Sequence, residues 1–186
     1  MFFKVFKNAS GTSSGEAVEK NKDSHRKNGI FAIKINKLTT GGSREKINMK
    51  VGITFSTFDL FHAGHVKMLE DAKRQCDYLI VGLQLDPSID RPEKNGPSQS
   101  IIERYIQLKG SKHVDEIVPY VSEQDLEDIL RSFKLDVRII GDEYKEKNFT
   151  GRTYCEEKGI EIYYNARDHR FSSSGLRKQV KIAEDK

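Results

Sequence analysis

From residue 49 onward, short apolar runs alternate with segments in which apolar residues recur at helical spacing. The apolar runs of strand length are "KVGITF" (50–55), "DYLIVGLQL" (77–85), "DEIVPYV" (115–121), "DVRIIG" (136–141) and "IEIYYN" (160–165). Strands that alternate with helices are typical of βαβ units and a mostly parallel sheet. The pattern therefore predicts an α/β fold with a five-stranded parallel sheet flanked by helices.

The segments between these runs are expected to be helical. We predict helices within residues 65–75, 98–110, 122–133, 151–159 and 172–186. In the first of them Val66, Leu69 and Ala72 recur at the spacing of one helix face, which predicts an apolar stripe against the sheet. Ser122, with Asp125 three residues later, indicates a capping box at the start of the third.

Residues 1–48 differ from the rest in composition and charge. They carry ten Lys and Arg against four Asp and Glu, a net charge of +6, whereas residues 49–186 carry −2. They are rich in Gly, Ser, Asn and Lys and hold few large apolar residues, so they cannot bury enough surface to offset the entropy of ordering. We expect a disordered N-terminal extension that takes no part in turnover, followed by a single domain over residues 49–186.

Composition also excludes several protein classes. No apolar run approaches the roughly 20 residues that cross a bilayer, and no signal peptide is recognisable, so we expect a cytoplasmic protein without membrane insertion. Cys76 and Cys155 lack metal-ligand spacing and are expected to be reduced thiols near the core. The basic residues of the N-terminal segment are diluted by Gly, Ser and Asn, which argues against a nucleic-acid-binding arm.

The stretch "STFDLFHAGH" (56–65) places two histidines where a strand turns into a helix. A helix that begins near Ala63 directs its N–H groups and positive dipole end toward an anion, and Gly64 permits close approach of the backbone. His62 and His65 could then reach the same phosphate. A metal site would need a third ligand, which this stretch does not supply. The histidines could also only cap or pack the helix, but the strand, turn and helix context favours an anion site.

Several motifs together resemble one family. "TFDLFHAGH" (57–65) resembles the TFD…HxGH signature of the cytidylyltransferase-like nucleotidyltransferases, and "DYLIVGL", "ERYIQL", "VDEIVP", "DVRIIGDEY" and "RDHRFSSSGLRK" resemble later motifs of that family in the same order. The resemblance runs from Lys50 to about Val180. It implies a Rossmann-like fold and transfer of CMP from CTP to a small phosphorylated alcohol such as glycerol 3-phosphate.

The resemblance also implies a mechanism and a set of site residues. The acceptor phosphate would attack the α-phosphorus of CTP in line and release pyrophosphate without a covalent intermediate, so catalysis is mainly positioning and charge stabilisation. The implied catalytic residues are His62, His65, Lys94 and Arg167. The implied nucleotide-binding residues are Thr57, Phe58, Gly64, Gly141, Asp142, Ser172, Ser173 and Ser174. The implied acceptor-binding residues are Asp59, Arg91 and Lys112.

The same resemblance implies a cofactor and partners. We expect Mg²⁺, bound through substrate phosphates with Asp59 as the candidate carboxylate, and no dedicated protein metal site. The implied small-molecule partners are CTP and a phosphorylated acceptor. The implied protein partner is a second copy of the chain, with residues 103–116 at or near the dimer interface.

Some positions depart from the family pattern and keep alternatives open. Ser56 and Tyr144 stand where the family has glycine and tryptophan, and Lys112 stands where it often has arginine. These departures leave the substrate undecided: an adenylyltransferase acting on a sugar phosphate, or a catalytically silent nucleotide-binding module, fits the same motifs. Lys94 is also compatible with an ordinary surface loop, and Arg104 with a solvated or ion-paired helix residue.

Overall fold

The computed structural model describes residues 49–185, and the predicted disorder of residues 1–48 lies outside the described residues. The described part contains a parallel sheet in the order β3-β2-β1-β4-β5. Its strands are β1 (Val51–Ser56), β2 (Tyr78–Gln84), β3 (Glu116–Tyr120), β4 (Val137–Gly141) and β5 (Glu161–Asn165). The predicted five-stranded parallel α/β fold is confirmed.

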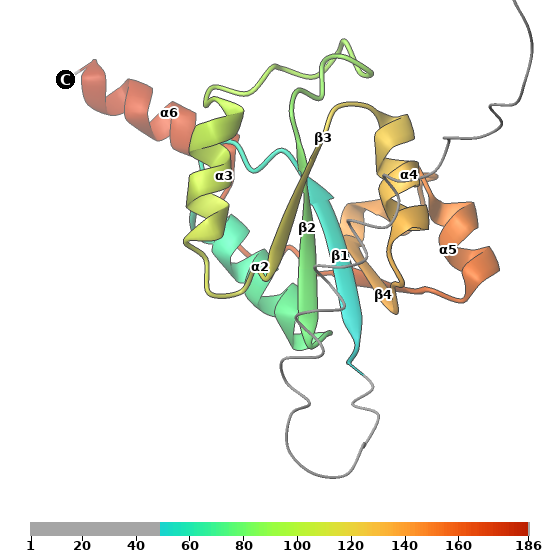
Figure 1. Cartoon of the computed structure of the whole chain (residues 1–186). Helices are drawn as coiled ribbons and strands as arrows, with labels where there is room; N and C mark the ends of the chain where they lie inside the picture. The colour runs from blue at the N-terminus through green and yellow to red at the C-terminus, as the bar shows by residue number, and fades with distance from the viewer. Residues whose placement is uncertain (1–48, 186) are drawn as a thin grey trace, which may run out of the picture. The chain divides into compact units, whose positions relative to one another are not determined.

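Helices cover both faces of this sheet. They are α2 (Ala63–Arg74), α3 (Ile101–Lys109), α4 (Glu123–Ser132), α5 (Arg152–Lys158) and α6 (Ser173–Glu184), with a short 3₁₀ helix η1 (Asp142–Tyr144) after β4. Figure 1 shows α2 and α3 on one face and α4 and α5 on the other. Among residues 49–185 no helix is long and apolar enough to cross a membrane.

The core lies mainly between the central strands and α2. Leu79, Val81 and Leu83 of β2 are fully buried in this core. Leu69 and Ala72 of α2 are fully buried in it as well. The expectation that Val66 belongs to the buried stripe is wrong, since its side chain is 40% exposed. The face of α2 that meets the core passes through Met68 and Leu69 instead.

Smaller predictions of local structure are confirmed. Cys76 and Cys155 are free thiols, and both are buried. Ser122 forms the expected capping box at the start of α4, because its hydroxyl accepts a hydrogen bond from the Asp125 N–H at 3.2 Å and the Asp125 carboxylate accepts one from the Ser122 N–H at 2.9 Å. These contacts fix the residue at which α4 begins.

The strand order sets the place of a ligand site. The chain passes from β1 through α2 on one face of the sheet, whereas β4, which pairs with the other side of β1, leads into η1 and α5. In open parallel sheets a crevice forms beyond the carboxyl ends of the strands at such a switch point. The fold therefore predicts a site between the ends of β1 and β4.

Candidate active site

A cavity of about 260 Å³ occupies this switch point. Its walls come from the ends of β1 and β4, the first turns of α2, and the segment between β5 and α6. Six of the residues predicted from sequence line it: His62, Gly64, His65, Gly141, Arg167 and Ser173. The fold thus brings together residues that lie up to about a hundred positions apart in the chain.

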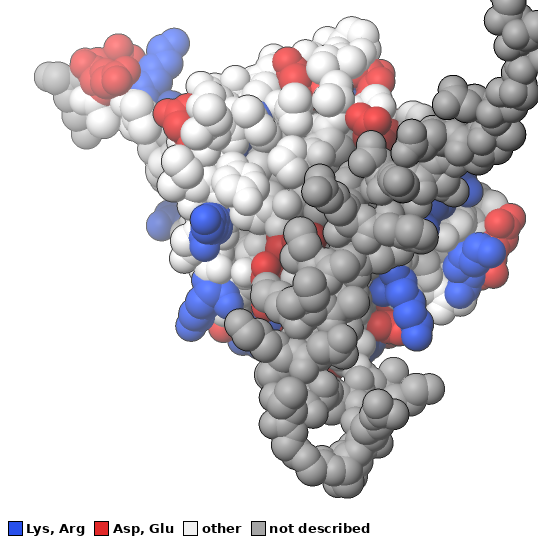
Figure 2. Space-filling model, viewed as in Figure 1, with Lys and Arg blue, Asp and Glu red and all other residues white. Residues whose placement is uncertain are grey.

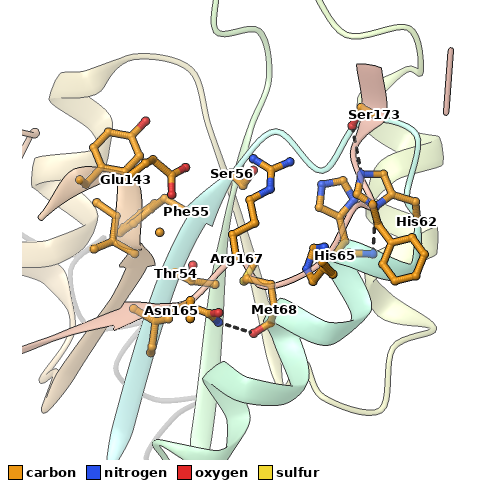
Figure 3. Close-up of a pocket in the computed structure, with 18 residues that line it drawn as sticks. Thr54, Phe55, Ser56, His62, His65, Met68, Glu143, Asn165, Arg167 and Ser173 are labelled. Carbon is orange, nitrogen blue, oxygen red and sulfur yellow. Dashed lines mark hydrogen bonds between the residues drawn. The ribbon is translucent and has the colours of Figure 1, made fainter. Parts of the chain in front are cut away.

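The cavity has two chemically different sides. In Figure 3, Glu143 and Phe55 lie on one side of β1, the two histidines lie on the other, and the Arg167 side chain extends between them. The first side offers a carboxylate and aromatic surface. The second offers imidazole, guanidinium and hydroxyl donors, which suit an anion.

His62 is both the cap of α2 and part of the cavity wall. Its Nδ1 accepts a hydrogen bond from the Gly64 N–H at 3.0 Å, so in the neutral ring the proton sits on Nε2. That Nε2 lies 3.3 Å from the Ser173 hydroxyl, which donates to the Asp59 carbonyl at 3.0 Å. Burial, together with the charge of Arg167, lowers the pKa of His62. His62 therefore presents a neutral N–H donor beside the start of α6.

His65 stacks against His62 with ring centroids 4.0 Å apart. The rings of Phe58 and Phe61 also contact it, at 5.2 and 5.7 Å between centroids. Burial, followed by the charges of His62 and Arg167, lowers the pKa of His65 to about 3. Any charge stabilisation by this ring at neutral pH therefore comes from an N–H donor and not from an imidazolium.

The loop from Thr57 to Phe61 that leads to these histidines has an unusual backbone. Phe58 and Leu60 both have φ of 51°, a region that side-chain-bearing residues seldom adopt. The Phe58 ring is 1% exposed and belongs to the core, so any phosphate contact of Phe58 would come from its backbone. Gln99 holds the loop: its side chain accepts from the Leu60 N–H at 2.8 Å, and its own N–H donates to the Asp59 carboxylate at 2.9 Å.

Asp59 is committed to internal contacts. One carboxylate oxygen accepts the Gln99 N–H, and the other pairs with Arg177 of α6 at 2.5 Å. Burial raises the pKa of Asp59, but hydrogen bonds from the Ser98 and Gln99 backbone and the charge of Arg177 outweigh it, so the net shift is downward. The carboxylate is ionised and enclosed, with an exposed fraction of 7%. A role of Asp59 in acceptor or metal binding would require it to give up one of these contacts, and that role stays a prediction.

Arg104 of α3 is neither solvated nor paired with a carboxylate. Its side chain is 1% exposed and donates to four backbone carbonyls. These belong to Gln99, Thr57, Gln84 and Leu85, at 3.1, 2.8, 2.7 and 2.7 Å. The guanidinium thus ties the loop after β1 to the loop after β2. Its partner Thr57 was predicted to bind the nucleotide, but Thr57 does not line the cavity.

The three serines before and within α6 have different places. Ser173 lines the cavity, as described above. Ser172 is the N-cap of α6, because its hydroxyl accepts from the Gly175 N–H at 3.1 Å. Ser174 lies beside it, with the two hydroxyl oxygens 3.3 Å apart. Ser172 and Ser174 do not line the cavity, and their expected contact with phosphate stays a prediction.

Four further predicted residues lie outside the cavity wall. Arg91 contacts Gln84 at 3.1 Å and Glu123 at 3.4 Å, and Lys94 is exposed on the same loop. Lys112 precedes β3 and so lies at the amino edge of the parallel sheet, opposite the cavity. Its assignment to an acceptor site within the same chain is wrong for that reason. Asp142 does not line the cavity, and its carboxylate accepts a long hydrogen bond from the backbone N–H of Arg167 at 3.5 Å.

Comparison with known proteins agrees with this geometry. The sequence profile described as cytidylyltransferase-like matches residues 53–179, which cover the sheet and the cavity. The chain belongs to the cytidylyltransferase-like family. Glycerol-3-phosphate cytidylyltransferase of Bacillus spizizenii is 37% identical over 134 residues, 71% of this chain and 98% of that protein. The enzyme of the same name from Bacillus subtilis is 32% identical over 133 residues, with the same coverage.

Other relatives of this cytidylyltransferase-like domain are matched over a smaller share of this chain. The bifunctional protein HldE of Helicobacter hepaticus is 35% identical over 109 residues, which is 58% of this chain but only 22% of HldE. A lipopolysaccharide core biosynthesis protein from Thermoplasma volcanium matches in structure with a TM-score of 0.52 at 22% identity, covering 67% of this chain and all of that one. The latter match supports the fold.

Several site residues of the cytidylyltransferase-like domain were not predicted. Asn165 is a buried polar residue at the end of β5 whose amide donates to the Met68 carbonyl at 3.1 Å. Its place at a strand end was a usable signal. Glu143, His169 and Arg177 lie inside motifs that resemble the family, but at positions to which no role was assigned. Gln99 carries no sequence signal for its loop contacts.

Proposed function

We propose that this protein transfers CMP from CTP to a small phosphorylated alcohol such as glycerol 3-phosphate and releases pyrophosphate. The observation that carries the proposal is the convergence of His62, His65, Arg167 and Ser173 on one cavity at the switch point. The relative from Bacillus spizizenii, matched over 98% of its length, supports the same reaction. Because both substrates are polar phosphorylated metabolites, we propose the cytoplasm as its location.

The donors of the cavity suit the charge changes of this reaction. In-line attack on the α-phosphorus places charge on its equatorial oxygens and on the leaving pyrophosphate. The neutral N–H of His65 and the guanidinium of Arg167 can donate hydrogen bonds to those oxygens. The N–H of His62 can do so when a phosphate oxygen replaces the Ser173 hydroxyl, which lies 3.3 Å away. Such fixed donors lower the barrier when they bind the transition state more strongly than the ground state.

The opposite side of the cavity suits the nucleoside. Gly141, Glu143 and Tyr144 follow β4 there, and Glu143 supplies a carboxylate that can accept a hydrogen bond from an exocyclic amino group. Cytosine and adenine both carry such a group. An adenylyltransferase acting on a sugar phosphate therefore remains the second candidate.

A substrate comparison tests the proposal. Pyrophosphate release is measured with CTP and with ATP, each combined with glycerol 3-phosphate or with sugar phosphates. We expect kcat/KM for CTP with glycerol 3-phosphate to exceed that of every other pair by at least about tenfold. A preference for ATP would favour the second candidate, and nucleotide binding without any release would indicate a catalytically silent module.

We propose that Mg²⁺ enters this site with the triphosphate. Glu143 is the acidic residue of the cavity wall, and among the described residues no group of three or more His, Cys, Asp or Glu side chains is arranged to hold a metal ion. The donor set therefore suits an ion held mainly by substrate phosphates, where Mg²⁺ would neutralise phosphate charge.

The expected result of chelation follows from that donor set. EDTA should abolish pyrophosphate release, whereas the melting temperature of the nucleotide-free protein should change by less than about 1 °C, because no structural metal is removed. Differential scanning fluorimetry with and without EDTA measures this. Unfolding of the free protein on chelation would contradict the proposal.

We also propose a homodimer formed through α3. Ile102 and Ile106 are 67% and 63% exposed, and Tyr105 beside them is 37% exposed. Figure 2 shows that the surface over α3 is largely uncharged. Residues 103–116, predicted to lie near the interface, overlap this helix from residue 103 to its end and include Tyr105 and Ile106.

Light scattering tests the dimer directly. At micromolar concentration the wild type should have twice the mass of one chain, and Ile106→Asp should be monomeric because a carboxylate would be buried without a partner. Ile182→Asp on α6, at a site 50% exposed, is the matched control and should remain dimeric. A monomeric wild type would refute the dimer.

A further inference from the structure

A third histidine lies in the same cavity as His62 and His65. His169 belongs to the segment between β5 and α6, and its ring packs against Phe171 with centroids 5.4 Å apart. It lies two residues after Arg167 and four before Ser173, both of which also line the cavity. The chain therefore gives this wall three polar side chains from one short segment.

Gly64 shows how closely two of the imidazoles approach. A Cβ atom at Gly64 would lie 2.9 Å from Cε1 of His169 and 2.9 Å from Cε1 of His62, closer than real Cβ contacts. The glycine thus leaves room for rings from two distant parts of the chain above the first turn of α2. The charge of His169 also acts on His62, as one of the causes that lower the pKa of His62.

The nitrogen atoms of the histidines differ in their partners. Both nitrogens of His62 have hydrogen-bond partners, the Gly64 N–H and the Ser173 hydroxyl. The Nδ1 atoms of His65 and His169 are both shielded from solvent and have no hydrogen-bond partner among the described residues. A shielded polar atom without a partner costs roughly 1–3 kcal/mol. Because Nδ1 of His169 is shielded, a ligand in the cavity can recover this cost only when the ring turns that atom toward the cavity.

The surroundings of His169 indicate the charge of that ligand. Arg167, His62 and Ser173 offer donors on this side, whereas Glu143 lies across β1 on the other. An anionic group is therefore favoured beside His169. In a bound nucleoside triphosphate, the anionic group farthest from the base is the pyrophosphate moiety.

We propose that His169 binds the pyrophosphate moiety of the nucleoside triphosphate, as a third imidazole beside the histidines of the HxGH motif. This inference rests on the proposed function for the identity of the nucleotide. The proposed contact is with the leaving group. Loss of His169 should therefore weaken the binding of pyrophosphate and of the triphosphate but not the binding of the nucleoside monophosphate.

Isothermal titration calorimetry tests the proposal on the full chain. The probes are inorganic pyrophosphate with Mg²⁺, CTP with Mg²⁺, and CMP. His169→Gln should bind pyrophosphate and CTP at least about fivefold more weakly than the wild type, the effect of one lost hydrogen bond to a charged group, and should bind CMP within twofold. Arg170→Gln removes a full charge from the neighbouring exposed residue and should change none of these affinities more than twofold.

Each other outcome overturns the proposal. Wild-type affinity for pyrophosphate in His169→Gln, or no binding of pyrophosphate by the wild type, removes the contact. Equal losses for CMP and pyrophosphate indicate a structural role for the ring. The proposed function fails separately: a wild type that binds CTP and pyrophosphate as expected but transfers no CMP leaves the His169 contact intact.

Discussion

Replacing His62 with asparagine is expected to lower kcat by about a hundredfold or more while KM for CTP changes much less. This is the scale of removing one donor that acts mainly in the transition state. Asparagine is a good N-cap residue, so its side chain can still accept the Gly64 N–H and hold the start of α2. The shorter side chain cannot place a donor where Nε2 of His62 lies, beside Ser173.

A cap exchange at another helix controls for stability. Ser122→Asn changes the N-cap of α4, which lies on the other face of the sheet, and should leave kcat unchanged. Both variants should melt within a few degrees of the wild type. If His62→Asn kept wild-type turnover, or lost it only in proportion to unfolding, His62 would be a structural cap and the proposed function would lose its main support.

The protonation state adds a second check on the same histidines. Because the pKa of His65 is lowered to about 3, its ring is already neutral across the working pH range. The pH profile of kcat/KM, which reports the free enzyme, should therefore show no fall between pH 5 and 8 from loss of a His65 proton. A fall that disappears in His65→Asn would show that the imidazolium is the active form.

Arg104→Met is expected to destabilise the protein by about 3 kcal/mol or more. The substitution leaves four carbonyls without their donors, and each buried polar group that loses its partner costs roughly 1–3 kcal/mol, reduced where water can enter. Arg104→Lys should recover only part of this, because an ammonium lacks the planar fork that reaches carbonyls of two loops. Urea denaturation measures the change in unfolding free energy.

Arg74 on α2 provides the matched arginine. It forms ion pairs with Asp71 at 2.6 Å and with Glu70 at 3.1 Å, which are about as short as the hydrogen bonds of Arg104. Its side chain, however, is 63% exposed. Arg74→Met should therefore cost less than about 1 kcal/mol. Equal losses in Arg74→Met and Arg104→Met would mean that burial of the guanidinium adds nothing, contrary to the structure.

The elements of the fold were predictable because each is encoded locally. Five apolar runs separated by helical periodicity specify the strands, and the rule that ligands bind beyond strand ends at a switch point places the cavity. Arg167, Ser173 and the two histidines follow strand ends or begin helices, so the topology alone gathers them at one edge. Lys112 could have been excluded by the same rule, since it precedes a strand.

Other features depend on contacts between distant residues and were not predictable. The ion pair of Asp59 was not predicted, because its partner, Arg177, lies 118 positions later. The low pKa of His65 depends on packing against Phe58 and Phe61. The positions of the Arg91 and Lys94 side chains depend on the path of the long loop between β2 and α3. No local pattern specifies any of these.

The loop from Thr57 to Phe61 bears on the stage of synthesis at which the chain becomes able to bind substrate. Two of its residues have positive φ, so its shape must be stabilised from outside, and its contacts come from Gln99, Arg104, Ser173 and Arg177. During synthesis, a nascent chain that ends before Ser173 already contains every strand of the sheet. It still lacks two of the residues that hold the loop, so the ability to bind substrate is expected only after the last helix leaves the ribosome.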